Sequence, residues 1–178
     1  MPVIESKLSN LDEHIQSSFD AIQLLYGKAH YQHARYCAFI LIDQLAWLVS
    51  DPKANVSTNF KTWVDKYFIP YYPELTAEEI LASRNGLLHR SSSISQSIER
   101  GFVDRQLWFI DNLKHAVDIK QDMATEKPGF YVVNSVKFIQ LALHGAVCDF
   151  RRDLTISTDL SLDEFDRKLG ELLQPVTL

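Results

Sequence analysis

Apolar residues recur at helical spacing along most of this chain. Between residues 9 and 27 they return every three or four positions, which predicts an amphipathic helix that Gly27 closes. A second helix is predicted over residues 30–50. It is apolar almost all round for most of its length, which is typical of a buried central helix. A short helix is predicted over residues 60–67, ending before Pro70.

The clearest helix start in the sequence follows Leu75. Thr76 and Glu79 have the spacing of a capping box, in which each side chain accepts the other residue's backbone N–H. Leu75 and Ile80 have the spacing of a hydrophobic staple around the same start. The helix is expected to end near residue 90, before a serine-rich loop.

The pattern changes after that loop. Residues 106–110 form a short run with strand character, because they are mostly aromatic and branched. Residues 115–119 are predicted to pair with them as a β-hairpin across Asn112. Residues 131–134 are expected to be briefly extended. The sequence therefore predicts a small β-hairpin insertion.

Two further helices are predicted after the insertion. Ser135 opens a long one, and Ser161 with Glu164 repeats the capping-box spacing for the last. The apolar stripe of the long helix consists of Val136, Ile139, Leu143, Ala146, Val147 and Phe150. The predicted fold class is mainly α, a helical bundle with the small β-hairpin inserted, and residues 1–178 form a single domain.

Composition narrows the function only slightly. The chain has 178 residues and a formal net charge of −5, which argues against a general electrostatic nucleic-acid binder. Cys37 and Cys148 lie inside apolar helical patterns and are expected to be reduced core residues. No signal peptide is apparent at the N-terminus, and no apolar run is long enough to span a bilayer. The expected location is cytoplasmic, with no membrane partner.

Arg84 is the most informative residue. At about 100° per residue it projects near the middle of an apolar sector formed by its own helix. A permanently charged guanidinium on a burying face needs a partner, an interface or a substrate. The members of that sector are Ala77, Ile80, Leu81, Leu87 and Leu88. The alternative is structural, with Arg84 paired to a carboxylate and His89 merely ending the helix.

The hexapeptide from Arg84 to His89 combines groups suited to phosphate chemistry. Asn85 and His89 are four residues apart and share a helix face, so the amide can select the imidazole tautomer. Arg84 and His89 are five apart, about 140° around the helix. A flexible arginine, a frayed last turn or a second copy of the helix would bring them together. Gly86 leaves the helix bare, as a close approach requires.

Arginine and histidine together suffice for cleavage of RNA without a metal. The ribose 2′-hydroxyl attacks the adjacent phosphate while a base removes its proton, a cation stabilises the phosphate and an acid protonates the leaving oxygen. One histidine cannot easily serve as base and acid at once. A symmetric dimer would supply two.

An arginine and a histidine separated by four residues, with asparagine directly after the arginine, resemble the motif of the HEPN superfamily. The segment from Leu81 to His89 is similar to that of small prokaryotic, plasmid- or phage-associated HEPN proteins. The resemblance covers residues 9–150 in architecture and about six residues in motif. It implies a HEPN-like helical bundle that forms a homodimer, with the two motif helices meeting on the two-fold axis.

In catalytic members of that superfamily, the paired motifs form one composite ribonuclease site that needs no metal or other cofactor. The resemblance therefore implies Arg84, Asn85 and His89 as catalytic residues, RNA as substrate, and a toxin or defence role with an antitoxin or other protein partner. Some HEPN toxins carry a modified tyrosine two residues after the histidine, where this chain has Ser91. Many HEPN domains are inactive binding or dimerisation modules, and a plain helical interaction protein is a third possibility.

Several other residues are weaker candidates. Asp43, inside the buried helix, is expected to pair with Arg84 or Arg35. His30 and His33 have a spacing that can bind zinc, but no further ligand lies near them in the sequence, so no metal site is predicted. His144 near Cys148 is taken as a packed or solvent-facing residue. The arginines are taken as a solvated face, with guidance of a phosphate backbone as the alternative: Arg100, Arg105, Arg151 and Arg152. The aromatics are taken as core residues, with stacking on bases as the alternative: Trp63, Tyr71, Tyr72 and Trp108. Glycine loops that bind phosphate or dinucleotides, and serine-hydrolase elbows, do not occur in the sequence.

Overall fold

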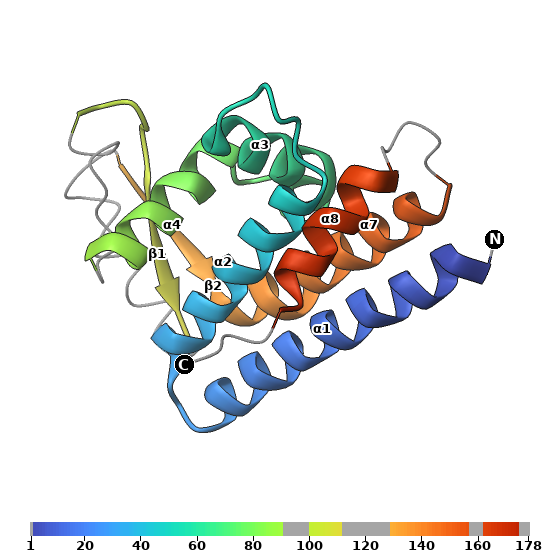
Figure 1. Ribbon diagram of the computed structural model, residues 1–178. Coiled ribbons are helices and arrows are strands. Elements are labelled where there is room, and N and C mark those ends of the chain that lie inside the picture. Colours follow the sequence, from blue (N-terminus) through green and yellow to red (C-terminus); the bar gives the residue numbers. More distant parts are fainter. Residues whose placement is uncertain (1, 91–99, 112–128, 157–161, 175–178) are drawn as a thin grey trace. The chain divides into compact units, whose positions relative to one another are not determined.

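The structure is a computed structural model that describes residues 2–90, 100–111, 129–156 and 162–174 (Figure 1). The described chain is mainly helical, as predicted. It forms two compact units, one of Met1–Asn59 with Asp153–Leu178 and one of Phe60–Arg152. Whether these two units belong to the single domain predicted over residues 1–178 is not tested by this division, and the single domain stays a prediction.

The first unit is built on a pair of helices, α1 (Pro2–Gly27) and α2 (Tyr31–Leu48), which lie side by side (Figure 1). Both were predicted, although α1 begins seven residues earlier than its apolar pattern indicates. The turn between them depends on Ala29, whose φ of 60° is left-handed, so Gly27 ends α1 without supplying the reversal. The core of the pair contains Leu11, Ile15, Ile22, Phe39, Ile42 and Leu45.

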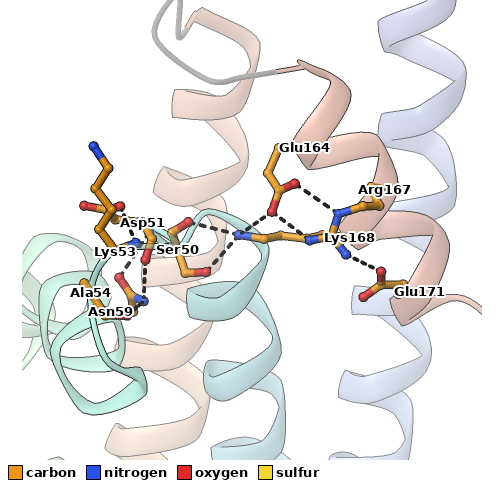
Figure 2. A network of polar contacts seen from close by, with 9 residues as sticks. All are labelled: Ser50, Asp51, Lys53, Ala54, Asn59, Glu164, Arg167, Lys168 and Glu171. Carbon is orange, nitrogen blue, oxygen red and sulfur yellow. Dashed lines mark hydrogen bonds and ion pairs between the residues drawn. The ribbon is translucent and has the colours of Figure 1, made fainter.

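The helix α8 (Leu162–Leu172) completes the first unit by packing on α2. Its amphipathic pattern buries Phe165 and Leu169. Ser161 of the predicted capping box lies outside the described residues. The other member, Glu164, binds the side chains of Arg167 and Lys168 (Figure 2), and the box itself stays a prediction.

In the second unit the chain leaves α3 (Val56–Trp63) without a break in its helical path. It passes through a π-helical turn η1 (Val64–Phe68) and a 3-10 turn η2 (Ile69–Tyr71). The predicted end before Pro70 was therefore wrong. Proline fits here because it lies at the start of the 3-10 turn, where its missing N–H is not required. Aromatic rings fill the core, with Trp63 and Tyr67 against Phe150 and Phe68 against Phe138.

The helix α4 (Ala77–Arg90) packs against β1 (Gln106–Ile110), the strand that the sequence predicted. The partner predicted for β1, residues 115–119, lies outside the described residues. Within the described chain, β1 pairs with β2 (Phe130–Asn134), and the pairing is parallel from Gln106↔Phe130 to Ile110↔Asn134. The small β insertion is confirmed, but this pair is not a hairpin, because parallel strands need a long crossover connection.

A long helix follows β2 directly. The Asn134 side chain accepts the backbone N–H of Lys137 at 3.0 Å and so caps the start. The helix runs through a π-helical stretch η3 (Lys137–Leu143) into α7 (His144–Ile156). Every residue of the predicted stripe is buried except Val136, which lies exposed in the first turn.

Candidate functional site

The start of α4 has the geometry that the sequence predicted. The backbone N–H of Thr76 donates to Glu79 Oε2 at 2.9 Å, and the N–H of Glu79 donates to Thr76 Oγ1 at 3.2 Å. Leu75 and Ile80, the predicted staple, are both buried. The capping box is confirmed, and it fixes where the helix with Arg84 begins.

A second interaction, which sequence reasoning missed, holds the same start. Arg105 donates from Nε to Glu79 Oε1 at 2.5 Å and from Nη2 to Glu79 Oε2 at 2.9 Å. Its Nη2 also donates to the backbone carbonyl of Glu74 at 2.8 Å. The Glu79 carboxylate is buried, and its hydrogen bond to Arg105 raises the pKa of that guanidinium. Arg105 is thus a structural residue, and no spacing in the sequence signals a partner 26 residues away.

The buried face of α4 differs from the predicted one. Its buried members are Ala77, Glu79, Ile80, Ala82, Ser83, Gly86 and Leu87. At about 100° per residue, Ser83 is at the centre of this face and Arg84 lies towards its border. The small residues Ala82, Ser83 and Gly86 are buried, while the larger Leu81 and Leu88 are only half-buried.

Arg84 is half-buried at that border, between the packed face and solvent. Its Nη1 donates to the side-chain Oδ1 of Asn85 at 2.8 Å. This acceptor is a neutral amide, which orients the guanidinium, and Arg84 makes a further contact besides this bond. Arg84 was predicted to need a partner, an interface or a substrate, and Asn85, the next residue of the motif, is one such partner.

The rest of the motif is less completely described. His89 belongs to the last turn of α4 by its backbone, and its side chain lies outside the described residues. The predicted bond from Asn85 to His89 therefore stays a prediction. Asn85 Oδ1 already accepts from Arg84, while the Asn85 amide nitrogen can still donate.

Ser83 is a candidate that sequence reasoning missed. Its side chain is buried, and its hydroxyl has no hydrogen-bond partner within the part of the chain that the structure describes. A buried hydroxyl without a partner costs about 1–3 kcal/mol.

The other predicted residues do not gather around the motif. Asp43 is half-buried on α2 and Arg84 belongs to the other unit, so their pairing stays a prediction. The rings of His30 and His33 lie edge-on at 6.0 Å. Across the described ranges, no group of three or more His, Cys, Asp or Glu side chains could hold a metal ion.

The cysteines and aromatics divide between core and surface. Cys37 is half-buried on α2, and Cys148 is exposed on α7, which contradicts its predicted place in the core. Cys148 is exposed because α7 turns its other side, with Ala146, Val147 and Phe150, into the core. Trp63 and Tyr72 are buried, as predicted, whereas the predicted core position was wrong for Tyr71 and Trp108, which are exposed.

Comparisons of the chain with protein-family models, curated proteins and solved structures found no match, so the HEPN resemblance depends on the motif and its helical setting. Among the described helices, none combines the length and apolar character needed to cross a bilayer.

Proposed function

We propose that this protein is a HEPN-type, metal-independent endoribonuclease that acts as a homodimer, as an RNA-directed toxin or defence factor. The observation that carries the proposal is the state of Arg84. Its guanidinium is half-buried, tied to the helix by a neutral amide and placed at the border of the packed face. A cation held in this way is prepared to bind a phosphate with little loss of side-chain entropy.

In this proposal each side chain of the motif has one role. Arg84 binds the scissile phosphate and stabilises the charge that builds on it. His89 of one copy removes the proton of the ribose 2′-hydroxyl, and His89 of the second copy protonates the leaving 5′-oxygen. Asn85 orients Arg84 through the bond described above, and its amide nitrogen orients His89.

The test is cleavage of a mixed-sequence single-stranded RNA in excess chelator. Wild-type protein should release fragments ending in 2′,3′-cyclic phosphate. Arg84→Ala and His89→Ala should each lower the rate by about 100-fold, because each removes a group that acts in the transition state. Arg100→Ala is the matched control, since Arg100 is exposed outside the motif and its removal should leave the rate unchanged. Equal rates for all four proteins would reject the assignment.

The alternative is a non-catalytic HEPN-like dimer that binds RNA or a protein partner such as an antitoxin. The Arg84–Asn85 hydrogen bond is compatible with this non-catalytic reading, because Asn85 Oδ1 holds the arginine side chain and is not used for His89. This reading predicts a dimer by sedimentation and RNA binding that weakens with salt, with no cyclic-phosphate product. A protein that stays monomeric at high concentration would contradict both readings.

A further inference from the structure

The exposed side of α7 carries a cluster of reactive side chains, separate from the Arg84 motif. His144, Cys148 and Arg152 follow one another at four-residue intervals and are all exposed, so they form one line along the helix. The Sγ of Cys148 lies 3.7 Å from Nδ1 of His144, within hydrogen-bonding distance for sulfur. An exposed thiol next to an imidazole is the arrangement that activates cysteine nucleophiles.

Tyr71 of η2 borders this thiol. Its hydroxyl donates to Asp149 Oδ2 at 2.8 Å, and Arg152 Nη1 binds Asp149 Oδ1 at 2.9 Å. Its ring lies against the helix backbone, because a Cβ added at Gly145 would come within 2.5 Å of Tyr71 Cε1. Among the residues that the structure describes, these contacts place four charged or titratable groups around Cys148: His144, Asp149 and Arg152 from α7 and Tyr71 from η2. The two opposite charges, Asp149 and Arg152, are paired with each other.

We propose that Cys148 is a redox modification site that forms a mixed disulfide with a small-molecule disulfide, with His144 as its proton acceptor. The inference is independent of the ribonuclease proposal, since it uses none of the motif residues. A nearby proton acceptor and access to the sulfur favour exchange of a cysteine with disulfides, and at Cys148 the His144 contact and the exposure of the thiol provide these two features.

The reaction is a thiol–disulfide exchange. The Cys148 thiol passes its proton to Nδ1 of His144, and the thiolate sulfur attacks one sulfur of the small disulfide. A new S–S bond forms at Cys148 as the original S–S bond breaks. The leaving thiolate takes the proton from the imidazolium and departs as a free thiol. Cys148 is oxidised, and one sulfur of the reagent is reduced.

The chain contains its own comparison for this site. His33 and Cys37 on α2 have the same four-residue spacing as His144 and Cys148. Cys37 is half-buried, however, and burial raises the pKa of its thiol. The ring of His33 lies edge-on against the rings of His30 and Tyr36. The His–Cys spacing is therefore the same at the α2 and α7 sites, while the exposure of the cysteine and the surroundings of the histidine differ.

The experiment follows adduct formation by intact-protein mass spectrometry, with glutathione disulfide and with the neutral disulfide of 2-mercaptoethanol. In the full-length Cys37→Ser protein, Cys148 should acquire one adduct with either reagent. In the Cys148→Ser protein, Cys37 should react about tenfold more slowly or not at all. Faster reaction at Cys37 would overturn the assignment.

The role of His144 is tested in the Cys37→Ser background. His144→Ala should slow adduct formation by about tenfold near neutral pH and change the pH dependence of the rate, because the imidazole no longer accepts the thiol proton. His33→Ala, the matched control, should leave rate and pH dependence unchanged. Unaltered kinetics in His144→Ala would reject the proton-acceptor role, since a merely structural histidine would not shape the pH dependence.

Discussion

Small residues determine how closely segments approach one another in the second unit. On α4 the buried face includes Ala82, Ser83 and Gly86, with Ser83 at its centre and Arg84 at its border. On α7, Gly145 admits the ring of Tyr71 against the backbone, with the Tyr71 hydroxyl bonded to Asp149. At Gly145 the missing side-chain volume is what lets the ring approach the helix.

Gly145→Ala is expected to destabilise the protein by about 1 kcal/mol, because overpacking against Tyr71 outweighs the helix propensity that alanine gains. Gly170→Ala is the matched control on α8. Nothing lies within 4 Å of a Cβ added there, so it should stabilise the protein by up to about 1 kcal/mol. Urea denaturation of both variants measures the two effects. A shift of the same sign in both would contradict the packing described for Tyr71.

Elements are joined by a few specific side chains, and α8 illustrates this best. Lys168 is 4% exposed, and its Nζ donates to the carbonyl of Ser50 at 2.9 Å and to Ser50 Oγ at 2.8 Å (Figure 2). Glu164 Oε1 lies 3.6 Å from the same nitrogen. Ser50 follows the end of α2, where carbonyl groups of the last turn attract a cation. Lys168 thus attaches α8 to the C-terminal end of α2.

Lys168→Met keeps most of the buried stem and removes the ammonium. It is expected to lower the free energy of unfolding by about 1 kcal/mol, through the hydrogen bonds lost to Ser50 and the lost cation at the end of α2. Arg167→Met is the adjacent control. Arg167 is exposed and binds Glu164 and Glu171 on its own helix, so its loss should matter much less. Equal losses in the two variants, by chemical denaturation, would contradict the attachment role.

At the scale of the whole molecule, stability should fall in acid. The pKa of Glu78 is lowered by a hydrogen bond from Lys61, and that of Glu164 by one from Arg167. The pKa of Glu74 is lowered by its own backbone N–H and by Lys137. A carboxyl group whose pKa is lower in the folded state stabilises the fold above its unfolded pKa, near 4.5, and the benefit disappears as pH falls through the folded value. Asp65 acts in the opposite direction, because burial raises its pKa.

The expected result is a melting temperature that is constant from about pH 7 to 5 and falls below about 4.5. Lys61→Met should flatten the acid limb slightly, because it removes the main cause of the lowered pKa of Glu78. Since these pairs are largely exposed, added salt should weaken the same effect. A melting temperature that rises in acid would show that the raised pKa of Asp65 dominates.

Much of the element order could be predicted from the sequence, because helix starts are local. Thr76 and Glu79 stand three residues apart, so their mutual hydrogen bonds were predictable without the fold. The Arg84–Asn85 bond is also local, although the sequence pattern pointed to His89 as the partner of Asn85. The hairpin of residues 106–110 with 115–119 stays a prediction, because residues 115–119 lie outside the described chain. The parallel pairing of β1 with β2 was not predicted, because it joins residues that are 24 positions apart, such as Gln106 and Phe130.

The sequence by itself determined the helices, the capped start of α4 and the position of the Arg84 motif within it, because these depend on residues less than two turns apart. Only the tertiary structure decided that Arg105 anchors Glu79, that Ser83 replaces Arg84 at the centre of the buried face, and that Cys148 is exposed. The physical reason is that burial and ion pairing depend on which distant segments come into contact. Helical periodicity gives the direction in which each side chain leaves its helix axis, but it does not say which other segment of the chain packs against that side.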